Sequence, residues 1–237
     1  WTSTLQDFLV SLSVVLENSK VSKMRKAAEF ADLALEKAMS FVEPGIKEVK
    51  IANIIMETLL DVGSEGIAFD TIVGTGSNAA IPHHTAGDTV VREKDHVVID
   101  MGAVYKGYRS DITRTVKASD SKDSKFDEIY GIVLEAQLCA IEASEPGIPA
   151  NSLDAIARDV IIGYGYGQYF SHGLGHGVGL DVHEKPMLVK SSVDTIDIGS
   201  VFTVEPGIYI PGWGGVRIED MVLMEESGPV VLTKTPK

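Results

Sequence analysis

Two separated stretches of this chain repeat one pattern: VEPGIKEVKIANIIMETLLDVG at residues 42–63 and SEPGIPANSLDAIARDVIIGYG at residues 144–165. Both contain Glu-Pro-Gly-Ile at the same point, and their apolar residues then recur in step until a glycine ends each stretch. A helical pattern precedes each copy, at residues 22–41 and 125–144, with apolar residues at three- and four-residue steps. Pro-Gly ends the first helix of each pair, and a second amphipathic helix follows. The repeat predicts two halves built on one plan.

Short β-rich segments follow each predicted helix pair. They are enriched in β-branched and aromatic residues and are punctuated by Gly and Pro, which is typical of strands and hairpins. The segments are residues 68–76, 96–105 and 109–118 in the first half and residues 172–180, 200–210 and 216–225 in the second. A chance match of Glu-Pro-Gly-Ile would not explain this shared order of elements. We predict an α+β fold in which two pseudo-twofold-related halves, each helix, helix and strands, form one curved antiparallel sheet backed by helices.

Composition excludes several classes of partner. A formal net charge of −13 is unfavourable for a nucleic-acid partner, which would need a basic patch. No apolar run approaches the ~20 residues that a membrane-spanning helix needs, so a membrane partner is not expected. The single cysteine, Cys139, excludes a disulfide framework within the chain. We expect it to be a structural thiol in a reducing, cytoplasmic setting.

Four carboxylates fall inside predicted β segments. Asp100 ends the apolar run HVVI, and Asp111 follows eleven residues later in the next segment. Glu205 and Glu219 occupy the equivalent places in the second half, on either side of a Gly/Pro turn. Buried charges are costly unless they are paired or metal-bound. On the first hairpin alone, a surface ion pair with Arg109 or Arg114 would explain the aspartates equally well. A pseudo-twofold axis would gather all four, and two divalent cations bridged by shared carboxylates would then balance their charge.

The segment SHGLGHGVGLDVHEKP, residues 171–186, places three histidines among four glycines. His172 and His176 have the spacing of a helical metal-binding pair, but each glycine in a helix costs ~1 kcal/mol relative to Ala, which argues against a helix. With a period of two, both histidines lie on one face of a strand, ~13 Å apart and too far to share one ion. One histidine is therefore expected as a metal ligand. The glycines predict a place where another backbone or a ligand comes close.

One imidazole with four carboxylates makes an oxygen-rich site. Such a site suits Mn²⁺, Co²⁺, Fe²⁺ or Zn²⁺, and the sequence does not choose among them. Paired divalent ions activate water as a nucleophile and polarise a carbonyl.

Three segments together resemble the pita-bread metallopeptidases, which include methionine aminopeptidase, Xaa-Pro aminopeptidase and Xaa-Pro dipeptidase (prolidase). They are VIDMGAVYKGYRSDITRT, SHGLGHGVGLDVHE and FTVEPGIYIPGWGGVRIEDMVL, and the similarity covers about residues 22–237. The resemblance implies the pita-bread fold and two divalent metal ions, with Asp111 and Glu219 as bridging ligands. The five ligands that it implies are Asp100, Asp111, His176, Glu205 and Glu219. Because all five residue types are present, a metal-free binding module on the same fold is the less favoured alternative.

The same resemblance implies residues that act on a substrate. His83 matches the histidine that contacts substrate, and its neighbour His84 is the alternative, either as a competitor for that role or as an ordinary surface histidine. His183 matches the histidine that stabilises the tetrahedral intermediate or the scissile carbonyl. Glu205, as a ligand that can exchange protons, is the candidate shuttle to the leaving nitrogen.

His172, Tyr209 and Arg217 match the substrate pocket of the proline-directed branch of the family. The expected function is therefore removal of the N-terminal residue from short peptides with proline second, by an Xaa-Pro aminopeptidase or Xaa-Pro dipeptidase. Methionine aminopeptidase is the main alternative within the family.

The expected organisation is one metallopeptidase catalytic domain over residues 21–237, because no low-complexity linker divides the chain. Residues 1–20 are expected to form a separate helix. Since the chain starts at Trp1 and proline-directed relatives carry an N-terminal domain, we interpret this helix as the tail of such a domain. A homodimer is a candidate assembly that the sequence does not decide.

Overall fold

The computed structural model describes the backbone of residues 2–120 and 122–237, and side chains from residue 19 onward except at residue 121. The helices are α1 (Thr2–Met39), α2 (Glu48–Asp61), α3 (Ser124–Glu142) and α4 (Ala150–Gly163), with short 3₁₀ helices η1 (Gly76–Ala80) and η2 (Gly167–Tyr169). The first-half strands are β1 (Ile72–Thr75), β2 (His96–Met101), β3 (Val104–Tyr105), β4 (Tyr108–Arg109) and β5 (Ile112–Lys117). The second-half strands are β6 (Ile148–Pro149), β7 (Gly175–Gly177), β8 (Glu184–Leu188), β9 (Thr195–Ile196), β10 (Val201–Val204), β11 (Gly207–Ile210), β12 (Gly214–Arg217), β13 (Asp220–Glu225) and β14 (Gly228–Val231).

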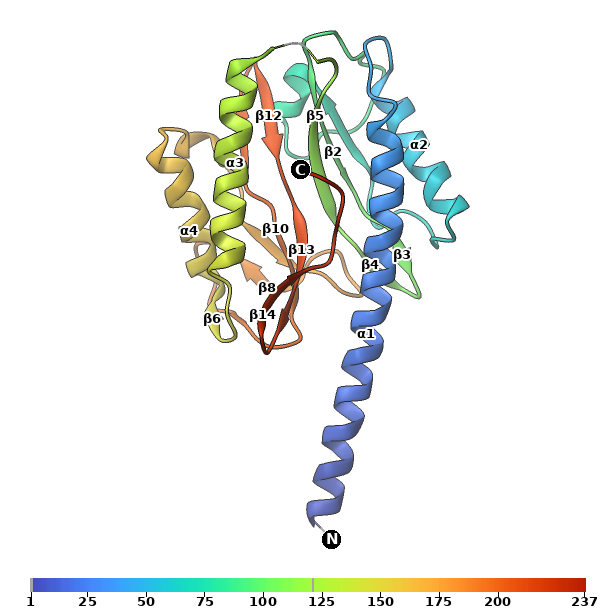
Figure 1. Cartoon of the computed structure of the whole chain (residues 1–237), viewed down its shortest axis with the longest axis vertical. Coiled ribbons are helices and arrows are strands. Elements are labelled where there is room, and N and C mark those ends of the chain that lie inside the picture. The colour runs from blue at the N-terminus through green and yellow to red at the C-terminus, as the bar shows by residue number, and fades with distance from the viewer. Residues whose placement is uncertain (1, 121) are drawn as a thin grey trace.

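The element order confirms the predicted plan of two halves, each with two helices followed by strands (Figure 1). The glycines of the repeat support this equivalence in detail. Gly45 and Gly147, from the two Glu-Pro-Gly-Ile sequences, have φ of +103° and +85°. Gly63 and Gly165, which end the repeated helices, have φ of +92° and +84°. Glycine takes this left-handed conformation at little cost, so the same residue ends the same element in both halves.

The predicted helix over residues 1–20 is not a separate element. Helix α1 runs without interruption from Thr2 to Met39 and extends beyond the sheets at its N-terminal end (Figure 1). The stretch contains neither glycine nor proline, so nothing in its sequence breaks the helix near residue 20. Trp1 lies outside the described residues, and the interpretation of residues 1–20 as the tail of another domain stays a prediction.

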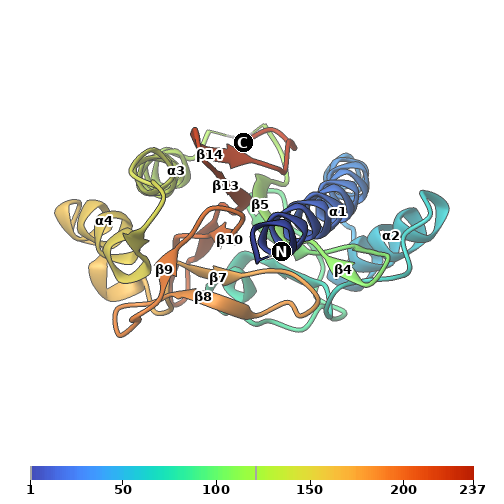
Figure 2. The ribbon, with the colours of Figure 1, turned by 90° about the horizontal axis from the view of Figure 1, so that it is seen from below.

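The strands pair antiparallel throughout the described ladders, as predicted. The curved sheet is divided, however, into a three-stranded sheet with order β1-β2-β5 and a five-stranded sheet with order β14-β13-β10-β7-β8. The α1–α2 pair flanks the strands on one side and the α3–α4 pair on the other (Figure 2). The two sheets meet along a seam where the Glu219 amide donates to the Thr113 carbonyl at 3.1 Å.

Each half has its own apolar core. One cluster joins α1 and α2 to β1, β2 and β5, and a second joins α3 and α4 to β10 and β12. A third, smaller cluster packs Met24 and Ala28 of α1 against β10 and β13, and so connects the halves. In the part of the chain that the structure describes, no helix combines the length and the apolar content needed to span a bilayer.

The prediction of a strand through the glycine-rich segment is confirmed only for Gly175–Gly177, which form β7, and bends lie on either side of it. His172 lies before the strand because its carbonyl accepts from Arg158 Nη2 at 2.7 Å instead of from a neighbouring strand. A Cβ atom on Gly175 would lie 2.1 Å from the Thr203 carbonyl oxygen, and one on Gly177 would lie 2.2 Å from that of Lys185. The glycines therefore admit the close approach of a neighbouring backbone, as their pattern predicted.

We predict that Gly175→Ala lowers the free energy of unfolding by about 1–3 kcal/mol, the usual cost of overpacking a filled core. Gly131→Ala is the matched control: Gly131 lies in α3, and a Cβ atom there meets nothing within 4 Å. That change should stabilise the protein by up to about 1 kcal/mol through helix propensity. Urea unfolding of both variants measures the difference, and equal stability of the two would contradict the close approach at β7.

Candidate metal centre

A cavity of about 490 Å³ lies between the two halves of the fold. Nine of the ten predicted site residues line it: His83, Asp100, Asp111, His172, His176, His183, Glu205, Arg217 and Glu219. The tenth, Tyr209, is 5% exposed and bonds to two of these residues. Residues from separate strands and loops thus converge on one site.

Strand register brings the four carboxylates together. Asp100 lies within β2 and pairs with Thr113 of β5, which begins one residue after Asp111. In the second half Glu205 directly follows β10 and Glu219 directly precedes β13, and these two strands pair with each other. Each half therefore supplies two carboxylates from adjacent strands, and the seam between the sheets joins the two pairs.

Asp111, His176 and Glu219 form the tightest group that could hold a metal ion among the described residues. Each offers one ligand atom, and these atoms all lie within 4.8 Å of one another. His176 Nε2 lies 3.2 Å from Glu205 Oε1 and 3.7 Å from Asp111 Oδ2. The other ring nitrogen, Nδ1, lies 3.1 Å from the Gly177 carbonyl oxygen and can donate to it. Burial lowers the pKa of His176, but the hydrogen bond and charge of Glu205 outweigh it and raise this pKa, so without a metal ion Nε2 donates to Glu205.

The acidic groups disturb one another's protonation. Burial and the charges of Glu219, Asp100 and Glu205 raise the pKa of Asp111 well above its usual range. Burial and the neighbouring carboxylates likewise raise the pKa of Glu219 well above its usual range. Burial also acts on Glu205, but the hydrogen bond and charge of His176 outweigh it and lower the pKa of Glu205 to about 2. Without a compensating cation, Asp111 and Glu219 therefore keep their protons to a higher pH than ordinary carboxyl groups do.

Asp100 is compensated on one side only. Its Oδ2 accepts from Arg217 Nη2 at 2.6 Å, whereas its buried Oδ1 has no hydrogen-bond partner among the described residues. Burial raises the pKa of this carboxyl despite the arginine. An unpaired buried carboxylate oxygen is costly, and a cation in the cavity would satisfy it.

Arg217 also connects the carboxylates to the far side of the cavity. Its Nη1 donates to the Tyr209 hydroxyl at 2.8 Å, and that hydroxyl lies 2.8 Å from His172 Nε2. Burial raises the pKa of Tyr209 to about 12, and burial lowers the pKa of His172. A neutral phenol and a neutral imidazole therefore form this wall, with the Arg217 charge directed at Asp100.

The remaining histidines differ in their surroundings. His183 is exposed at the cavity, and its ring centroid lies 4.1 Å from that of His176; burial and the charge of His176 lower its pKa. His83 is likewise exposed and lines the cavity. His84 is partly buried, and its Nε2 lies 2.9 Å from Glu48 Oε2, so it is not the ordinary surface histidine that the sequence offered as an alternative.

Glu48, a residue that sequence reasoning missed, organises the loop that carries His83. It is fully buried, and its carboxylate accepts from the Thr75 and Gly87 amides and from Asn78 Nδ2, in addition to its contact with His84. The repeat offered a signal here, because the equivalent position in the second copy is Ala150. A charged residue where the other copy has alanine marks a place where the halves differ.

Two threonines were also missed. The Thr113 hydroxyl donates to Glu219 Oε2 at 2.6 Å and accepts from Arg217 Nε at 3.1 Å. The Thr203 hydroxyl donates to Glu205 Oε1 at 3.0 Å and accepts from the His176 amide at 3.0 Å. Each threonine lies two residues from a predicted ligand, so strand periodicity could have placed it on the same face.

Comparisons with known proteins agree with this geometry. The family model described as metallopeptidase family M24 matches residues 22–226. The chain is 45% identical over 233 residues to an Xaa-Pro dipeptidase of Pyrococcus furiosus, covering 98% of this chain and 67% of that protein. The prolidase structure from the same organism superposes with a TM-score of 0.91 at 47% identity, over 92% of this chain and 65% of the other.

The X-Pro aminopeptidase structure from Thermotoga maritima superposes with a TM-score of 0.89 at 40% identity, over 92% of this chain and 62% of the other. The chain thus spans about two thirds of the length of these relatives. The superpositions confirm the expected pita-bread fold. Because the family model covers most of the chain and the Pyrococcus furiosus relative is 45% identical over 98% of it, the chain belongs to metallopeptidase family M24.

Proposed function

We propose that this chain holds two divalent metal ions and hydrolyses the first peptide bond of short peptides, with proline preferred in the second position. The observation that carries the proposal is the convergence of four carboxylates and the His176 imidazole on a single cavity. The negative charge of the four carboxylates exceeds the positive charge of the neighbouring side chains, as the raised pKa values of Asp111 and Glu219 indicate.

The donor set fits such ions. Oxygen ligands with one imidazole suit Mn²⁺, Co²⁺, Fe²⁺ or Zn²⁺, and the unpartnered Asp100 Oδ1 provides a free donor atom. The residues that would hold the ions are Asp100, Asp111, His176, Glu205 and Glu219. When bound, divalent ions supply Lewis acidity toward a carbonyl and lower the pKa of water.

Glu205 is the proposed proton carrier. It lines the cavity, and its Oε1 lies 3.2 Å from His176 Nε2. An ionised carboxylate can accept a proton from water and pass it to the leaving nitrogen. His183, kept neutral by its lowered pKa, retains one ring N–H, which would donate to the carbonyl oxygen as negative charge develops there.

The opposite wall is proposed to bind the substrate. His172, Tyr209 and Arg217 form a hydrogen-bonded row with well-defined donors and acceptors. His83 would contact the substrate from the loop that Glu48 holds, and Arg217 Nη1 also reaches the Pro82 carbonyl of that loop at 3.4 Å. Because Glu48 and Arg217 both hold this loop, it would lose little conformational entropy when a peptide binds.

The relatives support a proline-directed activity, since they are named Xaa-Pro dipeptidase and X-Pro aminopeptidase. Methionine aminopeptidase activity and a catalytically silent binding module are outcomes that the tests below separate. The cytoplasmic location and the homodimer stay predictions.

We predict that His176→Ala and Glu219→Ala each lower cleavage of an Xaa-Pro dipeptide at least about 100-fold, since both remove a proposed metal ligand. Metal analysis of the purified variants should show less bound metal. Glu57→Ala, which removes an exposed carboxylate of α2, is the control and should change neither quantity. Full activity of either ligand variant would exclude the proposed centre.

Substrate preference is the second test. We expect kcat/KM for Xaa-Pro peptides to exceed that for a Met-Ala peptide by at least about 10-fold, the discrimination that a shaped pocket provides. Dipeptide and tripeptide substrates compared in one assay separate dipeptidase from aminopeptidase. A preference for Met-Ala would favour methionine aminopeptidase, and metal binding without hydrolysis would favour the binding module.

Metal uptake should release protons. Metal ligands must be ionised, and the raised pKa values of Asp111 and Glu219 mean that the metal-free protein holds protons there to a higher pH than usual. Affinity for Mn²⁺ should therefore fall as the pH is lowered through these raised pKa values. Titration in weak buffer with a pH indicator measures the protons, and Glu219→Gln should release fewer. Uptake without proton release would contradict the assignment.

A further inference from the structure

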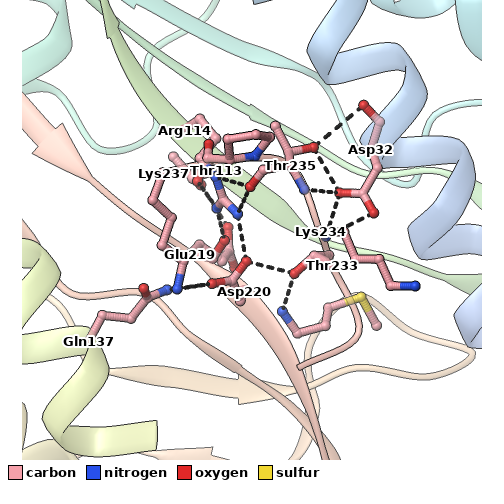
Figure 3. Close-up of polar contacts among 12 residues, drawn as sticks. Asp32, Thr113, Arg114, Gln137, Glu219, Asp220, Thr233, Lys234, Thr235 and Lys237 are labelled. Carbon is pink, nitrogen blue, oxygen red and sulfur yellow. Dashed lines mark hydrogen bonds and ion pairs between the residues drawn. The ribbon is translucent and has the colours of Figure 1, made fainter. Parts of the chain in front are cut away.

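Arg114 lies in β5, immediately behind the carboxylates, and does not line the cavity. It is 1% exposed and is among the largest fully buried side chains. Its Nη1 donates to the Glu219 carbonyl at 2.5 Å, and its Nη2 donates to Asp220 Oδ1 at 2.7 Å (Figure 3). A first-half arginine therefore binds the second-half segment that carries a proposed metal ligand.

Arg114 completes the set of contacts that hold Glu219. The Glu219 amide donates to the Thr113 carbonyl at 3.1 Å, and its carboxylate accepts from the Thr113 hydroxyl. With Arg114 on its carbonyl, Glu219 is fixed through its amide, its carbonyl and its side chain. Each of these contacts comes from β5, across the seam between the halves.

The C-terminal segment, residues 233–237, holds Arg114 from the other side. The Thr235 carbonyl accepts from Arg114 Nε at 3.1 Å and from Nη2 at 2.6 Å, and the Pro236 carbonyl accepts from Nε at 3.1 Å. The segment is in turn held by α1. Asp32 accepts from the Lys234 and Thr235 amides and from the Thr235 hydroxyl, at 2.8–2.9 Å (Figure 3).

Asp220 completes the cluster and is fully buried. Besides Arg114, it accepts from the Thr233 hydroxyl at 2.7 Å and from Gln137 Nε2 at 3.1 Å, and Lys237 Nζ lies 2.7 Å from its Oδ2. The free-energy cost of removing an ion pair from water offsets most of the attraction between its charges, so such a cluster contributes little net stability. Its position directly behind Glu219 gives it another role, which is placement.

We propose that Arg114 is a positioning residue for Glu219, and that the divalent-metal affinity of the centre depends on Arg114 and, through the C-terminal segment, on Asp32 of α1. The inference rests on the proposed metal centre. It adds residues that do not themselves line the cavity. The chain of contacts runs from Asp32 to the C-terminal segment, then to Arg114, and then to Glu219.

The test measures metal binding and stability separately on the full chain. Mn²⁺ is titrated calorimetrically into the metal-free protein, and thermal unfolding is followed in the presence of a chelator. The variants are Arg114→Met, Arg114→Lys and Asp32→Ala. Leu35→Ala is the matched control, because it lies three residues from Asp32 on α1, is fully buried in the first-half core and belongs to no polar cluster.

Arg114→Met should weaken Mn²⁺ binding about 10- to 100-fold, the usual effect of removing a group that orients a metal ligand. Arg114→Lys should also weaken it, because a lysine keeps the charge but lacks the planar guanidinium whose separate nitrogens reach Glu219, Asp220 and Thr235. Asp32→Ala should weaken it about 2- to 30-fold through the segment. Leu35→Ala should lower the unfolding temperature and leave Mn²⁺ affinity within about 2-fold of the unsubstituted protein.

Unchanged Mn²⁺ affinity in Arg114→Met overturns the inference, as does an equal loss in Leu35→Ala. If Arg114→Met does not fold, Arg114→Lys and Asp32→Ala decide by the same criterion. A failure of the proposed function looks different: the unsubstituted protein would then bind neither Mn²⁺ nor Co²⁺ nor Zn²⁺, whereas a failure of this inference leaves its binding intact.

Discussion

Repulsion among four carboxylates, held close together at the seam between two halves, is the constraint on which the rest of the structure depends. Like charges in a poorly solvated site cannot all stay ionised without compensation. The protein supplies that compensation unevenly. Arg217 binds Asp100, His176 binds Glu205, and Asp111 and Glu219 are left with raised pKa values. Asp100 and Glu205 are thus neutralised by side chains of the protein, whereas Asp111 and Glu219 would be neutralised by a bound cation.

The location of the site explains why the fold needs two halves. Each half has a separate apolar core, and neither core alone brings four carboxylates together. Besides the small apolar cluster around Met24, directional contacts hold the seam: Thr113 to Glu219, Thr115 to Arg217, and Arg114 to both Glu219 and Asp220. Hydrogen bonds fix register and distance in a way that apolar packing does not. A small rotation of one half against the other would break these hydrogen bonds and separate the carboxylates.

Much of this could be predicted from the sequence, because the chain is locally consistent. Helix periodicity, the repeat and its glycines predicted the order of the elements, and the motif segments predicted which residues would line one cavity. The exceptions share a cause. From its place in the sequence, Arg114 is expected only as a surface ion-pair partner of the nearby aspartates. In the structure it binds Glu219, Asp220 and Thr235, which lie more than a hundred residues further along the chain. The division of the sheet and the contact of His84 with Glu48 also depend on long-range pairing, which period and spacing do not encode.

Glu48 has a consequence for how such an enzyme can diversify. Its single carboxylate gathers the loop around His83, and its counterpart in the other half is Ala150, so the two-fold plan is broken at this point. Glu48 holds this loop, whereas contacts across the seam hold the carboxylates, and Arg217 links the two through the Pro82 carbonyl. Substitutions in the loop can therefore reshape what the cavity accepts while the reacting groups keep their places. The repeated plan thus holds the reacting groups at its seam and the substrate loop at a position where its two halves differ.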